Sequence, residues 1–408
     1  MIGSPLPPRG LYVHVPFCRS LCPYCDFVVI AGAAAFGPRS RLGGYVAAVE
    51  REIELRADAV DATFGTSARE ETGRDGSSRA PLESLYLGGG TPSLLPADRL
   101  ERLIDLVRSR FGLAATAEVT LEVNPGADER GDLAAAVRAG VTRVSIGAQV
   151  MDESALRTLG RRHAPSDVVA TVAAARDAGA TSVSLDLLAD IPDLSLDGWS
   201  ASLESALALQ PDHLSIYALT LALDDDADDD RLATPAGALA WRGRAAAAQD
   251  EERAAAEIER IDVRLPAAGY SWYEISNWAR PGHESRHNRH YWERAAVEAV
   301  GPGAHAFDGV RRRWNAANLD AWESALRNGE LPPGGSAPLD DPRAVGHVPV
   351  AGRAAHARKV LASIQGGWCH RLDGQHRVEG GNAVCLGWWN LEASAHLSEP
   401  TVAHEPDA

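Results

Sequence analysis

Short apolar, β-branched runs alternate with Ala-, Arg- and Leu-rich stretches from residue 11 to about residue 220. The expected strands are Leu11–Val15, Ser84–Leu87, Glu118–Val123, Arg143–Gly147, Ser182–Leu187 and His213–Leu219. The expected helices lie near 43–57, 97–111, 129–139, 165–178 and 197–209, with Pro near their starts and Gly past their ends. This alternation predicts βαβ units, and therefore an α/β fold with a parallel sheet. The six strands predict an incomplete (β/α)6 TIM-like barrel, with its active face at the carboxyl ends of the strands.

Three segments interrupt this pattern. Residues 61–80 are polar and Gly/Ser-rich, which predicts a solvent loop inserted into the barrel. Residues 224–230 hold six aspartates in seven positions; a solvated loop is the simpler interpretation, and a cation or partner site is the alternative. Residues 343–408 contain six of the 13 His and the only Lys, with no strand or helix period, so we interpret them as an anomalous tail that a shifted reading frame or a diverged segment would explain. The expected units are therefore 1–222, 223–342 and 343–408.

The charge balance limits the classes of partner. The chain carries 40 Lys and Arg against 56 Asp and Glu, a net charge of −16, which argues against a nucleic-acid binder. No signal-peptide pattern is present at the start, and the longest small-apolar run, Val28 to Phe36, is far shorter than the ~20 residues of a membrane span. We therefore expect a cytoplasmic protein that meets a membrane only through its partners.

Three of the five cysteines fall within eight residues, directly after the first expected strand. Cys18, Cys22 and Cys25 form C-x3-C-x2-C, a spacing that lets three thiolates reach one metal centre. A [4Fe–4S] cluster normally takes four cysteines, so three would leave one iron open to an outside ligand. A zinc site completed by His14 or another His, which would define a zinc-stabilised interaction module, is the alternative. A chance grouping of buried cysteines is the third interpretation.

The stretch from Tyr12 to Phe27, YVHVPFCRSLCPYCDF, resembles the radical S-adenosylmethionine (SAM) superfamily. More narrowly, it is similar to the branch of oxygen-independent coproporphyrinogen III oxidases and HemW heme chaperones. The resemblance implies a [4Fe–4S] cluster on Cys18, Cys22 and Cys25, with SAM bound to the fourth iron. It also implies an electron donor, since the cluster cleaves SAM to a 5′-deoxyadenosyl radical by passing it an electron.

Further motifs follow in the family's order: LGGGTPS at 87–93, EVTLEVNP at 118–125, GVTRVSIGAQ at 140–149, LGRRH at 159–163 and SLDLL at 184–188. The resemblance places a SAM pocket at these strand ends, with Arg161 near the SAM carboxylate, a group that suits a guanidinium. The implied cofactor-binding residues are Tyr12, Tyr24, Gly89, Gly90, Thr91, Glu122, Gln149, Arg161 and Asp186. The chain departs from the family after Asp186, where Asp190 and Asp193 replace two glycines and add carboxylates beside the pocket.

Two features separate the two branches of this family. The oxidases carry a further cysteine two residues after the third one, and here that position is Phe27. Residues 287–292, HNRHYW, match the HNxxYW motif associated with heme binding in the chaperones, which makes His287 the candidate heme ligand. His is an ordinary axial ligand of heme iron, and neighbouring aromatic rings offer flat apolar faces to a porphyrin. The alternative interpretation is a helix whose aromatic side chains pack on the barrel while its histidines bond to the backbone.

The resemblance spans about residues 11–330 and implies a C-terminal α+β extension that contains the HNxxYW and GPGA segments. It implies an iron–sulfur protein that binds heme and transfers it to acceptor proteins. The enzyme alternative is oxidative decarboxylation of coproporphyrinogen III to protoporphyrinogen IX, which Phe27 argues against.

Overall fold

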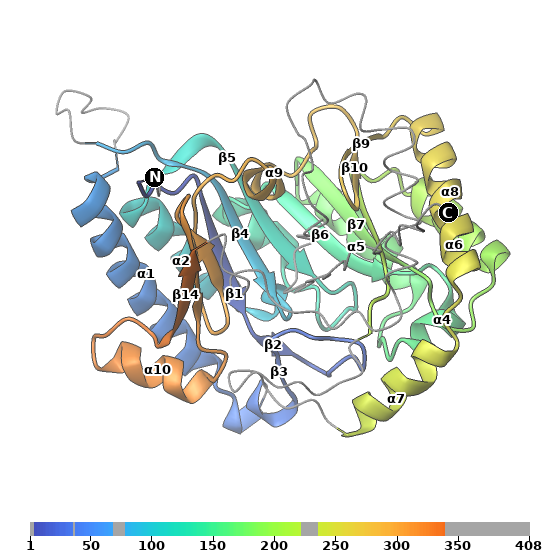
Figure 1. Cartoon of the computed structure of the whole chain (residues 1–408), viewed down its shortest axis with the longest axis horizontal. Coiled ribbons are helices and arrows are strands. Elements are labelled where there is room, and N and C mark those ends of the chain that lie inside the picture. The colour runs from blue at the N-terminus through green and yellow to red at the C-terminus, as the bar shows by residue number, and fades with distance from the viewer. Residues whose placement is uncertain (1–3, 36, 68–77, 222–235, 339–408) are drawn as a thin grey trace, which may run out of the picture.

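The computed structural model describes residues 4–35, 37–67, 78–221 and 236–338 (Figure 1). In chain order the first half contains β1 (Gly10–Val15), β2 (Phe17–Cys18), β3 (Ile30–Ala31), α1 (Leu42–Phe64), β4 (Leu82–Gly89), α2 (Ala97–Arg110), β5 (Leu113–Val123), α3 (Leu133–Ala139), β6 (Arg143–Gln149) and α4 (Glu153–Thr158). The second half contains α5 (Pro165–Asp177), β7 (Ser182–Ala189), α6 (Leu196–Ala208), β8 (His213–Ala218), α7 (Ala236–Ala247), α8 (Glu251–Ala267), β9 (Ser271–Glu274), β10 (Asn277–Ala279), α9 (Arg286–Trp292), β11 (Val297–Val300), β12 (His305–Phe307), β13 (Arg311–Asn315), α10 (Leu319–Arg327) and β14 (Gly334–Pro338).

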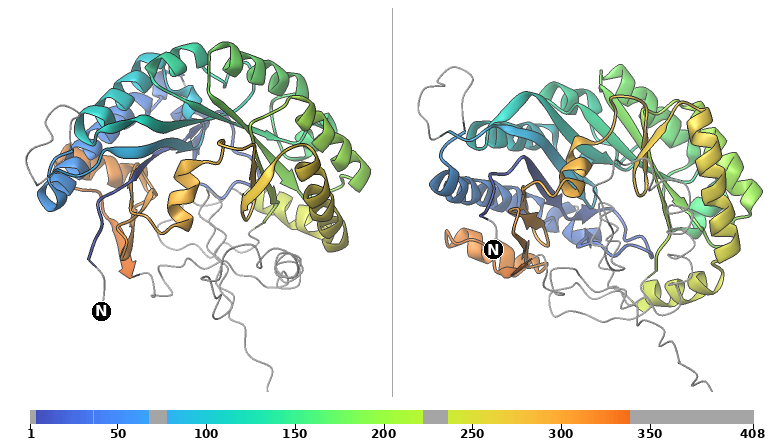
Figure 2. Two further views of the ribbon diagram at one scale, coloured as in Figure 1. Left: turned by 90° about the horizontal axis from the view of Figure 1, so that it is seen from above. Right: turned by 45° about the horizontal axis from the view of Figure 1, so that its top comes forward.

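The six predicted strands are confirmed as one parallel block, in the order β1-β4-β5-β6-β7-β8. Nearly every residue of β1, β4, β6 and β7 is buried, as expected for a parallel sheet that is covered on both faces. The sheet is curved, with its covering helices on the convex side and α9 on the concave side (Figure 2). The result is an α/β fold with a large, mostly parallel sheet that brings the carboxyl ends of six strands to one edge.

The proline and glycine residues that the sequence places at helix ends are confirmed in two helices. Pro165 is the first residue of α5, a position at which a missing N–H costs no helical hydrogen bond. Gly140 follows α3 in the left-handed conformation, with φ of 115°, which glycine adopts without a side-chain clash. The helix predicted near 129–139 begins only at Leu133, because the side chain of Asp132 caps it by accepting from the Ala135 N–H. The six-residue helix α4 was not predicted.

The solvent-loop prediction for 61–80 is wrong at both ends of that segment. Residues 61–64 form the last turn of α1, and Ser67 pairs with Arg79 in an isolated β-bridge. Arg79 is buried; its guanidinium forms an ion pair with Asp61 (2.9 Å) and donates to the Phe111 carbonyl (2.6 Å). These contacts tie both ends of the segment to the fold, while residues 68–77 lie outside the described part.

The chain after β8 extends the same sheet at both edges. Strands β10 and β9 add antiparallel to β8, and β11 adds parallel to β1, followed by the antiparallel run β12-β13-β14. The 12 strands have a linear order from β14 to β9. The predicted boundaries near 222 and 342 fall in segments outside the described residues, as do the aspartate run and the tail from 343. Within the described part, no helix is long and apolar enough to cross a membrane.

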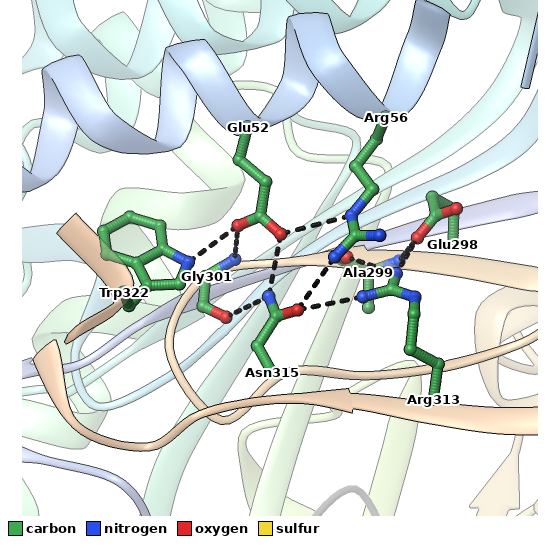
Figure 3. Close-up of polar contacts among 8 residues, drawn as sticks. All are labelled: Glu52, Arg56, Glu298, Ala299, Gly301, Arg313, Asn315 and Trp322. Carbon is green, nitrogen blue, oxygen red and sulfur yellow. Dashed lines mark hydrogen bonds and ion pairs between the residues drawn. The ribbon is translucent and has the colours of Figure 1, made fainter. Parts of the chain in front are cut away.

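A buried polar network joins this extension to α1 (Figure 3). Glu52 is fully buried, and its carboxylate accepts from Gly301 N, Trp322 Nε1 and Asn315 Nδ2 at 2.8 Å each, and from Arg56 Nε at 3.3 Å. Arg313 donates to Asn315 Oδ1 (2.9 Å), pairs with Glu298 and donates to the Ala299 backbone carbonyl. One carboxylate thereby connects α1, α10, β13 and the turn after β11.

Candidate iron–sulfur and cofactor site

The three clustered cysteines lie on the loop between β2 and β3, which we call the cluster loop (residues 18–29). Cys18 ends β2, and the Cys25 N–H donates to the Cys22 carbonyl at 3.0 Å, which makes a tight turn between the last two thiols. All three side chains are partly buried and line one cavity that opens to solvent. The sequence therefore brings three thiols into one cavity at the carboxyl edge of the sheet.

Side chains from two strand ends and from the loop after α4 connect two of these thiols. Thr91 Oγ1 donates to Cys18 Sγ (3.5 Å) and accepts from Asn124 Nδ2 (3.1 Å). Asn124 Oδ1 accepts from Arg161 (2.6 Å), whose other terminal nitrogen donates to Cys22 Sγ (3.5 Å). This chain of hydrogen bonds fixes the thiols relative to the strand ends before any ligand is bound.

The thiols fit an iron–sulfur cluster better than a single ion. Burial raises the pKa of Cys18 to about 12, so this group needs a strongly positive centre in order to lose its proton. A single ion needs at least three ligands that converge on one point. Among the described residues, no group of three His, Cys, Asp or Glu side chains has this arrangement. His14, the proposed fourth zinc ligand, has its two ring nitrogens at hydrogen-bond distance from the Val28 carbonyl (2.8 Å) and the Tyr12 hydroxyl (3.0 Å). A cluster spreads its ligands over several irons and does not require such convergence.

The glycine segment at the end of β4 passes too close to β1 and β2 for any side chain. A Cβ on Gly89 would lie 2.6 Å from the His14 ring, and one on Gly90 would lie 2.7 Å from the Phe17 carbonyl oxygen. Gly89 also has φ of 110°, which L side chains rarely adopt. Glycine is therefore required here by packing, and the backbone forms part of the cavity wall.

Glu122 is a buried carboxylate at the centre of this wall. It accepts from the Tyr86 hydroxyl (2.8 Å) and from the Gly89 N–H (3.0 Å). Burial raises its pKa to about 8, although these two donors oppose the shift. A carboxylate held in this state gains most from a cation or from hydroxyl donors that enter the cavity.

Gln149 reaches the cavity through a distortion of β6. The β6–β7 register shifts between Ile146 and Gln149, and Gln149 has a left-handed φ of 64°. Such bulges turn a side chain away from the ordinary strand direction. Gln149 Oε1 is buried and has no hydrogen-bond partner among the described residues. An orphaned amide oxygen at a cavity wall is a candidate acceptor for a bound ligand.

Asp186 completes the polar side of the cavity. It accepts from Ser145 Oγ at 3.1 Å, and burial raises its pKa to about 6. The wall thus offers a guanidinium (Arg161), two carboxylates (Glu122, Asp186) and an unpaired amide (Gln149) within one space. These donors and acceptors suit SAM, an amino acid joined to a nucleoside. The residues present therefore fit both groups that the motifs imply.

The structure brings most of the predicted cofactor residues together, but not all. Tyr24, Gly89, Gly90, Glu122, Gln149, Arg161 and Asp186 line the cavity with the three cysteines. Tyr12 and Thr91 lie behind the wall, bonded to His14 and to Cys18 respectively. The sequence prediction omitted Asn124, Ser145 and Tyr217, which also line it. Asn124 and Ser145 belong to the motifs at 118–125 and 140–149, where a polar residue is a signal, and Tyr217 lies on β8.

His287 lies away from this cavity, on the concave side of the sheet. It is fully buried in α9, with Nδ1 at 2.7 Å from Ser84 Oγ and Nε2 at 3.1 Å from the Tyr291 hydroxyl. Burial lowers its pKa well below the usual value, so the ring is neutral. Glu118, on β5, accepts from the Arg286 and His287 N–H groups at the start of α9. Iron can bind this ring only if one of its two side-chain hydrogen bonds opens.

The two aspartates that replace family glycines retain the glycine backbone. Asp190 has φ of 56° and Asp193 has φ of 62°. Asp and Asn tolerate this region better than other L residues. The Asp190 carboxylate forms an ion pair with Arg253 of α8 (2.7 Å) and is not part of the cavity wall. The turn therefore directs the Asp190 carboxylate toward Arg253 and away from the cofactor cavity.

Comparisons with known proteins agree with this site. Residues 12–204 match the family model of the radical SAM superfamily. The chain is 38% identical to the heme chaperone HemW of Mycobacterium tuberculosis over 81% of this chain and 78% of that protein. It is 35% identical to HemW of Escherichia coli over 74% of this chain and 70% of that protein. The chain therefore belongs to the HemW family of the radical SAM superfamily.

A solved structure matches the fold. Coproporphyrinogen III oxidase (HemN) from Escherichia coli, described as a radical SAM enzyme, superimposes with a TM-score of 0.65 and covers 82% of this chain and 73% of that chain. Its sequence identity is 22%, so this similarity concerns the fold.

Proposed function

We propose that this protein is a heme chaperone that carries a [4Fe–4S] cluster and SAM on an incomplete six-stranded barrel. The single observation that supports it most is the common cavity of Cys18, Cys22 and Cys25 with Glu122 and Arg161. The three cysteines would hold the cluster, and the polar wall would hold SAM on its open iron. An electron donor would reduce the cluster, and heme-acceptor proteins would receive the cargo.

The heme part of the proposal rests on the HemW relatives and on α9. His287 is the candidate iron ligand, and ligation exchanges its bond to Tyr291 or Ser84 for a bond to iron. Trp292 at the end of the same helix is one of the few exposed large apolar side chains of the described residues and offers a face to a porphyrin.

Anaerobic reconstitution followed by heme titration tests both parts. We expect a brown protein with about four irons per chain, and a heme Soret band that His287→Ala weakens. His290→Ala is the matched control, because His290 is buried on the same helix. A colourless protein with one zinc per chain would refute the cluster assignment. Equal heme binding by the two variants would refute the assignment of His287 as the heme ligand. Conversion of coproporphyrinogen III with SAM and a reductant would favour the oxidase instead.

A further inference from the structure

Arg242, on α7, is a buried cation that contacts three residues of the cluster loop. It is 3% exposed, and its Nε donates to the Pro23 carbonyl at 2.9 Å. One terminal nitrogen donates to the Cys25 carbonyl (2.8 Å) and forms an ion pair with Asp26 (2.7 Å). These residues are more than 210 positions away in the sequence.

Trp241, the residue before Arg242 on α7, packs near the same loop. The ring of Trp241 lies 6.4 Å from that of Tyr24, and its Nε1 donates to the Thr158 carbonyl at 3.0 Å. After the end of α4, a Cβ on Gly160 would lie 2.8 Å from Pro23 Cδ. The loop between Cys22 and Cys25 therefore packs against both α7 and the residues that follow α4. Helix α7 lies beyond residues 12–204, which match the superfamily model.

From these contacts we infer that Arg242 is a positioning residue for the iron–sulfur cluster. A planar guanidinium that binds two carbonyls and a carboxylate at once sets the direction of the loop between Cys22 and Cys25. Its fixed charge also lies next to the loop, where it favours the more negative, reduced state of a cluster. Arg242 acts through the loop and contributes no ligand of its own.

This inference rests on the proposal that the three cysteines hold a cluster. Its test compares Arg242→Gln, Arg242→Lys and the wild-type protein, each reconstituted anaerobically. Arg244→Gln is the matched control, since Arg244 is an exposed arginine two positions along the same helix. The measurements are the rate of iron loss to a chelator, the reduction potential and the electron paramagnetic resonance (EPR) spectrum of the reduced cluster.

We expect Arg242→Gln to lose iron about 10- to 100-fold faster, the range typical of residues that orient metal ligands, and to have a lower reduction potential. Arg242→Lys should keep a reduction potential close to that of the wild type, because lysine retains the positive charge. It should still lose iron faster, because lysine lacks the planar set of donors that binds two carbonyls and a carboxylate at once. Arg244→Gln should change none of the three measurements. Equal iron retention and potential in Arg242→Gln and Arg244→Gln would overturn the inference.

A folding defect is distinguished with a second position. Asp26→Asn removes the ion pair at a side chain that is 35% exposed, so it should fold normally and still lose iron faster than Arg244→Gln. If Arg242→Gln does not fold, an Asp26→Asn protein that behaves like the control overturns the inference. A wild-type protein without iron would instead refute the proposed function.

Discussion

Replacement of Glu52 by glutamine tests whether the buried network of Figure 3 holds the extension to the barrel. Each carboxylate oxygen of Glu52 accepts two donors: Gly301 N and Trp322 Nε1 on one, Asn315 Nδ2 and Arg56 Nε on the other. The glutamine side chain has the same shape but only one acceptor oxygen. Two of the four donors must therefore face an NH2 group.

The expected loss of stability follows from the two donors that are left without an acceptor. A buried donor without its acceptor costs about 1–3 kcal/mol, so two of them cost about 2–6 kcal/mol. We expect a loss of about 3 kcal/mol in the free energy of unfolding, because local relaxation recovers part of the cost. Glu54→Gln on the same helix is the control; this side chain is 40% exposed and pairs only with Arg51 in the described contacts, so its change should stay within about 0.5 kcal/mol.

The assay is urea unfolding of the cluster-free protein, followed by circular dichroism. A double-mutant cycle with Trp322→Phe isolates one bond of the network, because phenylalanine keeps most of the packing against Tyr45 and removes only the Nε1 donor. We expect a coupling energy of about 0.5–3 kcal/mol. A Glu52→Gln protein as stable as Glu54→Gln, or strictly additive single changes, would refute the reasoning.

Three further predictions concern the cofactor cavity and the turn beside it. SAM affinity, measured by calorimetry, should rise with pH up to about 8 and level off above it, because the Glu122 carboxyl has a pKa of about 8 in the protein without SAM. The Glu122→Gln variant should bind SAM more weakly, and its affinity should not rise with pH. Arg161→Lys should weaken SAM binding about tenfold, since it keeps the charge but loses a charged hydrogen bond, whereas Arg162→Lys, at a half-exposed neighbour, should match the wild type. Gly303→Ala should lower stability by about 1–3 kcal/mol more than Gly282→Ala in urea unfolding, because both glycines have positive φ but only a Cβ at 303 meets a neighbour, at 2.6 Å.

The sequence predicted well whatever depends on neighbouring residues. Strand β6 begins at Arg143 as expected, because its β-branched core lies between Gly140 and a strand-end turn. Strand β5 begins five residues before the predicted Glu118, since its first residues, Leu113 to Thr116, are partly or fully exposed and Ala-rich, a composition atypical of strands. The shared position of the three cysteines was predictable as well, because they lie within eight residues of one another in the sequence.

The sequence could not predict contacts that only the fold creates. Asp190 looked like a charge added to the cofactor cavity, whereas its partner is Arg253, 63 positions later on a helix outside the sheet. The predicted loop at 61–80 was read from its composition, which carries no sign that Arg79 is buried against Phe111. Arg242 lies in an Ala-rich helix with no motif, and nothing near it in the sequence indicates a function.

The extension emerges as part of the cluster site and not as an appendage. Glu52 accepts from the Gly301 N–H, and the turn that begins there packs on β1 and on the end of the cluster loop: a Cβ on Gly301 would lie 2.5 Å from the His14 carbonyl oxygen, and one on Gly303 would lie 2.6 Å from the Val28 side chain. Arg242 contacts the middle of the cluster loop. Both supports come from outside the superfamily match at 12–204. A protein cut after β8 would therefore keep all three cysteines and lose both restraints, which is why cluster binding must be assayed on the full chain.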